Sequence, residues 1–410
     1  MLGLAGLQGC SSLDWINGQT LYVMVVTQTS LDWLRRDALE DRLWNPLVEE
    51  YRRLHPNVRL SLFTVNEDGV EQELRRRTSR GLGPDLILVR APLANTLLEE
   101  GLIAPVPLTP SMERTIEQIA PRYLARVRHG SDLAGLPLHE LVTLACFNRQ
   151  RVSSPPSTTE DLMALAASGR TIGLSIDPYG IWWTAGTRDA DKAIVPLLTG
   201  NLASGPATTD ALNEAKITAW LAWLRQIAQQ SNVDIASGPQ ELSEGLISSR
   251  LDWIPCFSIT LDLLKTQMGN RLGVSALPRG PGGVPSPFNS LQVWAFGLDS
   301  SPRQRAYASD LARLSVDPLL QRRYVLESRE VLPVNLAVET PVASSGVLAA
   351  LAEAQNQFQA GSPLLSSPFT LNHLSVVALQ LEELIQQVMV GVLTPREGME
   401  AIQRLGENSR

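Results

Sequence analysis

The sequence predicts an α/β protein of two units, and three patterns support this. Short apolar runs typical of buried strands alternate with amphipathic helical segments over the first hundred residues. The same alternation resumes after residue 157. Between the two regions lies one long extended segment, GLPLHELVTLACFN (135–148). Because alternating strands and helices favour a mostly parallel sheet covered by helices, we expect one such sheet in each unit.

The first hundred residues contain three expected helices and three expected strands. One helix precedes Pro56, because the apolar residues from Leu43 to Leu54 recur at helical spacing. A second helix, EQELRRRTSRGLG, ends at Gly81 or Gly83, and the third is LANTLLEEG. The strands are continuous apolar runs, as expected for strands buried on both faces, and they cover 20–26, 58–65 and 85–89.

The second region repeats this pattern and contains three helix starts. Ser157 precedes Glu160 by three residues, which is the spacing of a capping box. Ser301 begins another helix with Gln304 at the third helical position, and Thr394 begins the last helix in the same way. The other expected elements are a helix over 211–230 and strands over 171–176, 273–278 and 292–298, with the connector PRGPGGVPSP before the last strand.

The composition is that of an ordinary folded protein, with 44% hydrophobic and 19% charged residues in a chain of 410. The net charge of −7 argues against nucleic acid as the main partner. No apolar run approaches the ~18–20 residues of a membrane-spanning helix. The sequence contains no nucleophile elbow, P-loop, HExxH or paired-cysteine motif, so we expect neither catalysis nor a cofactor or metal. A glycosidase with two carboxylates across a cleft is the enzymatic alternative.

Two of the three cysteines lie within apolar runs. Cys146 is part of LVTLACFN and Cys256 is part of LDWIPCFSI, so we expect both to be core residues. They form no paired metal or redox motif, and a disulfide between them is the less favoured alternative.

Four stretches, in the same order along the chain, resemble segments of one known family. LWNPLVEEYRRLHPNVRLSL is similar to its first helix and second strand, and RGLGPDLILVRAPLANTLLEEGLIAPV to its Pro-Asp strand and the helix that follows. LAGLPLHELVTLACFNRQRVSSPPSTTEDLMALA is similar to its hinge strand and next helix start, and LEELIQQVMVGVLTPREGMEAIQ to its closing helices. The chain thus resembles the extracellular solute-binding proteins of family 1, which are maltose-binding-protein-like receptors of ATP-binding-cassette importers.

The resemblance implies a two-lobe periplasmic-binding-protein (type II) fold with crossing hinge strands. Residues 138–142 and 288–294 would be the hinge strands, with a third crossing near Val334-Asn335-Leu336. The implied divisions are a signal remnant and tether over 1–19, an N-terminal lobe over 20–138 plus 288–335, and a C-terminal lobe over 139–287 plus 336–410.

The function that the resemblance implies is capture of a carbohydrate or sugar-like compatible solute between the lobes and its delivery to a membrane permease. We expect a monomer. The aromatic fraction of 5% favours a small solute over an oligosaccharide. The alternatives are a receptor for a non-sugar solute, such as a betaine, amino acid or polyamine, and a sensor that signals to a partner protein.

The residues LQGC at positions 7–10 resemble the lipid-attachment signal of an exported protein, in which a small residue precedes the modified cysteine. We therefore expect a periplasmic or extracytoplasmic protein that is anchored by a lipid on Cys10. A remnant of an ordinary signal peptide and a coincidence are the alternatives, because the apolar stretch before Cys10 is short and has no Lys or Arg.

Sugar receptors of this family stack aromatic rings on sugar faces and bind hydroxyl groups with carboxylates, amides and arginines. Aromatic and polar residues near the predicted strand ends and on the hinge strands are therefore the candidate contacts, and the loop DPYGIWWTAG (177–186) is the first choice. Core packing is the alternative for the tryptophans and the favoured interpretation of Trp294. A surface position is the alternative for the arginine, and a hinge salt bridge for the histidine and glutamate. The candidates are Tyr179, Trp182, Trp183, Arg90, His139, Glu140, Asp252, Trp253, Asn289, Gln28, Thr29 and Trp294.

Overall fold

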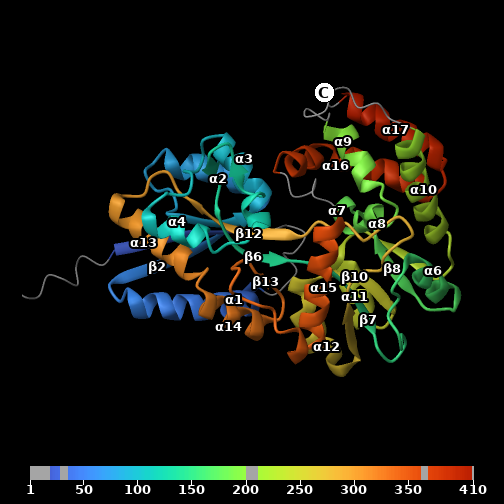
Figure 1. Cartoon of the computed structure of the whole chain (residues 1–410), viewed down its shortest axis with the longest axis horizontal. Helices are drawn as coiled ribbons and strands as arrows, with labels where there is room; N and C mark the ends of the chain where they lie inside the picture. The colour runs from blue at the N-terminus through green and yellow to red at the C-terminus, as the bar shows by residue number, and fades with distance from the viewer. Residues whose placement is uncertain (1–18, 28–35, 200–210, 362–367, 409–410) are drawn as a thin grey trace, which may run out of the picture.

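A computed structural model describes residues 19–27, 36–199, 211–361 and 368–408. Figure 1 shows two lobes that lie side by side, each built around its own sheet with helices packed over it. The predicted two-lobe α/β architecture is confirmed.

The first lobe contains the N-terminal segments and a later return of the chain. Its elements are β1 (Gln19–Thr27), α1 (Arg36–Leu54), β2 (Val58–Asn66), α2 (Val70–Thr78), β3 (Leu86–Arg90), α3 (Ala91–Glu99), α4 (Pro110–Ile116), α5 (Pro121–Leu124), β4 (Arg128–His129), β5 (Asp132–Leu133), β6 (Leu136–Leu141), β12 (Ser290–Phe296), α13 (Pro302–Leu314), α14 (Pro318–Ser328) and β13 (Leu332–Pro333).

The second lobe contains the middle of the chain and its C-terminal helices. Its elements are β7 (Thr143–Asn148), α6 (Thr159–Ala167), β8 (Ile172–Ser175), α7 (Pro178–Ile181), α8 (Trp183–Gly186), α9 (Asp191–Thr199), α10 (Ala211–Ala228), β9 (Val233–Ala236), α11 (Pro239–Ile247), β10 (Trp253–Phe257), α12 (Leu261–Met268), β11 (Leu272–Ser275), α15 (Gly346–Gly361), α16 (Pro368–Met389) and α17 (Pro395–Asn408). Short 3-10 turns lie at Glu67–Gly69, Ser258–Thr260, Gly269–Arg271 and Val342–Ser344.

The two main sheets are separate. The first has the strand order β13-β6-β12-β3-β1-β2 and the second has the order β11-β7-β10-β8-β9. All residues of β6 and β7 are buried, as expected for strands that lie inside their sheets. The helices α16 and α17 pack with α9 and α10 in the second lobe, and α16 also approaches α3 of the first lobe.

The chain first crosses between the lobes at Val142. Strand β6 ends at Leu141 and β7 begins at Thr143, and the backbone N–H of Val142 donates to Oγ of Ser258 over 3.2 Å. The lobe bounds taken from the resemblance assign residues 139–141 to the second lobe. They remain in the first sheet instead, because β6 continues its pairing with β12 and β13 through these residues.

Two of the three expected helix starts are confirmed. Ser301 forms a capping box with Gln304, and Oγ1 of Thr394 accepts the backbone N–H of Glu397. The third prediction was wrong by one residue. The capping box of α6 is made by Thr158 and Asp161, because Asp161 occupies the third helical position and its carboxylate accepts the N–H of Thr158.

The two core cysteines are joined, so the less favoured alternative is the correct one. Cys146 and Cys256 are both buried, as expected, and they form a disulfide with Cα atoms 5.8 Å apart. It links the neighbouring strands β7 and β10 across 110 residues of sequence. Disulfides persist mainly in oxidising compartments such as the periplasm and the cell exterior.

Within the described ranges, no helix is both long and apolar enough to cross a membrane.

Candidate functional site

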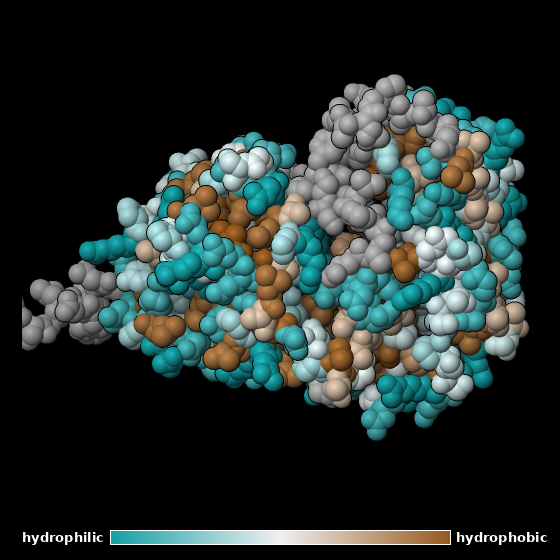
Figure 2. Space-filling view, in the orientation of Figure 1, coloured by the Kyte–Doolittle hydropathy of each residue, from teal (hydrophilic) through white to brown (hydrophobic). Residues whose placement is uncertain are grey.

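Strand direction brings the carboxyl ends of the parallel strands in both sheets to the junction of the lobes. In the first sheet β12 is antiparallel to β6 and β3, so β3, β1 and β2 run with β6 toward the crossing at Val142. In the second sheet β7 starts at the crossing and β10 is antiparallel to it, so β10, β8 and β9 end there. Figure 2 shows the surface hollowed between the lobes. This cleft is the expected ligand position, because ligands of open α/β sheets bind outside the carboxyl ends of the strands.

The first-lobe edge of the cleft contains an ion pair. Arg90 is the last residue of β3 and Glu67 follows β2, and their side chains are paired. They are 28% and 22% exposed, so both retain polar atoms that a solute could contact. The prediction of Arg90 as a strand-end polar group agrees with this position. Gln28 and Thr29, which follow β1, lie outside the described residues.

The second-lobe edge contains a small pocket. Oγ of Ser175 accepts the backbone N–H of Asp177 over 3.2 Å. A side chain at Gly180 would place its Cβ 2.6 Å from Cβ of Ser175, so glycine is required where α7 approaches β8. The aromatic residues made this loop the first candidate, whereas its polar residues were not predicted, although both groups lie at the same strand end. The pocket is lined by Thr143, Ser175, Asp177, Gly180, Pro239, Leu242, Pro255, Cys256 and Phe257.

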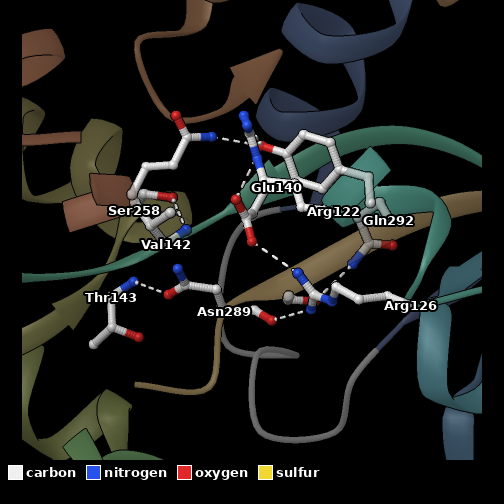
Figure 3. Close-up of polar contacts among 11 residues, drawn as sticks. Arg122, Arg126, Glu140, Val142, Thr143, Ser258, Asn289 and Gln292 are labelled. Atoms are coloured by element: carbon white, nitrogen blue, oxygen red, sulfur yellow. Dashed lines mark hydrogen bonds and ion pairs between the residues drawn. The ribbon is translucent and has the colours of Figure 1, made fainter. Parts of the chain in front are cut away.

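Three buried side chains, one half-buried side chain and one backbone carbonyl form a network at the crossing, which we call the hinge cluster (Figure 3). Arg126 donates to Glu140 over 2.8 Å and to the carbonyl oxygen of Asn289 over 2.6 Å. Tyr123 donates its hydroxyl proton to Glu140, and Gln355 of α15 donates to that hydroxyl oxygen. The side chains of Arg126 and Glu140 are 3% and 2% exposed. The cluster therefore connects α5, β6, the start of β12 and α15, and it links the two lobes.

Glu140 and Asn289 belong to this junction. Glu140 forms the hinge salt bridge, which was the alternative to a ligand contact. Oδ1 of Asn289 accepts the backbone N–H of Thr143 over 3.1 Å, which ties the two crossing segments together. Nδ2 of Asn289 is buried and has no hydrogen-bond partner in the part of the chain that the structure describes.

The aromatic candidates do not line the cleft in this conformation. Trp182 and Trp183 are 1% and 0% exposed and belong to the core of the second lobe. Trp182 packs edge-on against Trp220. The reason is that α7 packs against α16, and α8 packs against α9 and α10, so apolar rings in this loop are buried among the second-lobe helices. Tyr179 is in α7, and its side chain is outside the described part.

Three further candidates lie away from the cleft edge. Asp252 and Trp253 stand at the beginning of β10, whereas the cleft is at its end. Asp252 accepts the N–H of Thr171 over 3.1 Å, and Trp253 is fully buried. Trp294 is a core residue, as favoured from the sequence, and its indole N–H donates to Ser315.

The sequence profile of the bacterial extracellular solute-binding protein family matches residues 46–352. The chain belongs to this family. The match covers well over half of the chain, including most of both lobes. Members of the family are receptors, so this solute-binding protein is not an enzyme.

Solved structures show the same fold over almost the whole solute-binding protein. One is the GacH receptor of Streptomyces glaucescens GLA.O, known unliganded and with acarbose, at a TM-score of 0.73 and 14% identity over 95% of this chain and 98% of that one. Another is a solute-binding protein of an ABC transporter from Thermotoga lettingae TMO bound with α-D-tagatose, at a TM-score of 0.69 and 16% identity over 96% and 100%.

A curated relative matches a shorter part of the chain. The maltotriose-binding protein of Pyrococcus abyssi (strain GE5 / Orsay) is 24% identical over 153 residues, which is 37% of this chain. The match spans about a third (32%) of that relative's length.

His139 is a buried neutral group on the hinge strand β6. It is 3% exposed, and its Nδ1 lies 3.2 Å from the hydroxyl of Tyr324. Burial lowers the pKa of His139 to about 3. In the unfolded chain a histidine titrates near pH ~6.5. Below that pH the unfolded state therefore binds one more proton than the folded state, and stability falls as the pH falls.

Replacing His139 with asparagine should remove this pH dependence. Between pH 7 and pH 5 the histidine alone should lower the wild-type free energy of unfolding by about 2 kcal/mol, a decrease that the variant lacks. Urea unfolding of both proteins at the two pH values measures the difference, and the titration of other groups cancels in it. Equal decreases in the two proteins would show that His139 is not buried neutral.

Proposed function

We propose that this protein is the substrate receptor of an ATP-binding-cassette importer and captures a carbohydrate or sugar-like compatible solute in the cleft. It would then deliver the solute to membrane permease subunits. The observation that carries the proposal is a pair of polar edges at the carboxyl ends of the strands in the two lobes: Arg90 with Glu67 on one lobe, and Ser175 with Asp177 on the other. A solute that hydrogen-bonds to both edges favours the closed arrangement, and only such a preference can shift the population toward closure.

The chemistry of the pocket favours a small polyhydroxy solute. Its polar groups are hydroxyls and a carboxylate, which bind sugar hydroxyls, and Phe257 is the one aromatic residue among the described residues of its lining. A betaine needs several aromatic faces around its ammonium group. The similar structures were solved with acarbose and α-D-tagatose. Because the side chains of Trp182 and Trp183 are buried in the core of the second lobe, we propose a mono- or disaccharide, a small glycoside or a polyol as the ligand.

We also propose that the receptor is held at the outer face of a membrane by a lipid on Cys10. The residues LQGC support this, and the family is one of extracellular proteins. Cys10 itself lies outside the described residues. The alternative functions, a receptor for a non-sugar solute and a ligand sensor that signals to a partner protein, would use the same cleft to bind their ligand.

A thermal-shift screen tests the proposal. The panel holds D-tagatose, maltose, maltotriose, trehalose, glucosylglycerol, polyols, glycine betaine and amino acids. A bound solute at 100 times its dissociation constant adds about 2.7 kcal/mol of stability, so one sugar or polyol should raise the melting temperature at millimolar concentration.

A stereoisomer of the best compound is the control, because sugars at high concentration stabilise proteins without binding and do so regardless of stereochemistry. A shift produced only by glycine betaine or amino acids would overturn the carbohydrate proposal.

A further inference from the structure

Thr143 carries a buried hydroxyl at the crossing between the lobes. The residue is 3% exposed, and its Oγ1 has no hydrogen-bond partner among the described residues. Other buried threonines of the same lobe are satisfied: the hydroxyls of Thr184 and Thr187 donate to backbone carbonyls over 2.7 and 2.6 Å. A buried hydroxyl without a hydrogen-bond partner destabilises the folded protein, so we expect a functional reason for it.

The position of Thr143 in the fold gives a functional reason for this hydroxyl. It is the first residue of β7, directly after the crossing at Val142, and it pairs with Phe257 at the end of β10. Its side chain lines the pocket that also contains Ser175 and Asp177. The hydroxyl of Thr143 therefore belongs to the polar second-lobe edge of the cleft.

Thr143 is also attached to the hinge cluster. Its backbone N–H donates to Oδ1 of Asn289, and the carbonyl of Asn289 accepts from Arg126, which pairs with Glu140 (Figure 3). Thr143 thus joins the pocket to both crossing segments. A ligand contact made by this side chain would therefore be connected to the residues of the hinge cluster.

We propose that the Thr143 hydroxyl is a ligand contact and forms a hydrogen bond with a hydroxyl group of the bound polyhydroxy solute. This inference rests on the proposed function and adds a residue of the hinge crossing to the site. The bond satisfies a group that has no partner among the described residues, so it contributes to affinity without breaking any hydrogen bond that those residues make.

The substitution Thr143→Val tests the proposal, because valine keeps the shape and the backbone N–H and removes only the hydroxyl. Titration calorimetry with D-tagatose, maltose and maltotriose should show a dissociation constant at least ~10-fold weaker than wild type for whichever sugar wild type binds, which is the ~1.4 kcal/mol of one hydrogen bond. The melting temperature of the sugar-free variant should rise or stay unchanged. Thr143→Ser, which restores a hydroxyl, should recover most of the affinity.

Thr187→Val is the matched control. It removes a hydroxyl that is already paired, so it should lower the melting temperature and leave sugar affinity unchanged. The inference is overturned if Thr143→Val binds sugar as wild type does, or if it lowers the melting temperature as the control does. Wild-type protein that binds neither these three sugars nor any other sugar, glycoside or polyol of the thermal-shift panel contradicts the carbohydrate proposal and this inference with it. Wild-type binding with an unaffected valine variant contradicts the inference alone.

Discussion

Replacing Arg126 with methionine should lower the free energy of unfolding by about 3–5 kcal/mol. The guanidinium and the carboxylate of Glu140 are both almost fully buried, and each is the charged partner of the other. Removing the cation leaves a carboxylate in the interior without compensation, which costs far more than the loss of a surface pair. Urea unfolding at pH 7 measures the change.

A double variant separates the charge from the shape of the site. Arg126→Met with Glu140→Gln removes both charges, so it should recover much of the stability that the single variant loses. Arg396→Met is the control, since its ion pair with Glu400 is exposed and should contribute nothing measurable. A single variant as stable as wild type would mean that the hinge cluster is not a buried ion pair.

Removal of the disulfide should cost about 2–5 kcal/mol. The bond between Cys146 and Cys256 closes a long loop and fixes β7 beside β10, the strands that carry Thr143 and Phe257 to the cleft. The variant with alanine at both cysteines should therefore unfold at a lower urea concentration than wild type. Adding a reductant should lower the wild-type midpoint toward that of the variant and leave the variant unchanged.

Thiol counting gives an independent check of the bond. In protein that lacks residues 1–18, and with them Cys10, the remaining cysteines are Cys146 and Cys256, so the denatured protein should show no free thiol before reduction and two after it. Two thiols before reduction would contradict the disulfide and return both residues to the free core cysteines that the sequence favours.

The fold could be predicted because its signals are local. The apolar runs that became β1, β2 and β3 and the cap residues at Ser301 and Thr394 each depend on a few neighbouring residues. The disulfide could not be predicted in this way, since Cys146 and Cys256 become neighbours only when β7 pairs with β10. The hinge cluster has the same origin, because it joins residues from distant parts of the chain.

The position of Arg90 at the end of a buried strand could be predicted, because the apolar run before it is a local signal. Its contact with a ligand stays a prediction. Trp182 and Trp183 were misleading, since an aromatic residue after a strand has the same sequence signal whether it faces a cleft or a core. Asp252 lies away from the cleft for a different reason. It precedes β10, and the start of a strand lies at the opposite edge of the sheet from its end.

A crystal structure of the protein with the sugar that gives the largest thermal shift would locate the ligand. We expect electron density for that sugar between the lobes, with contacts to Arg90 or Glu67 on one side and to Ser175, Asp177 or Thr143 on the other. Density for the sugar elsewhere on the molecule, with the cleft empty, would contradict the proposed binding site.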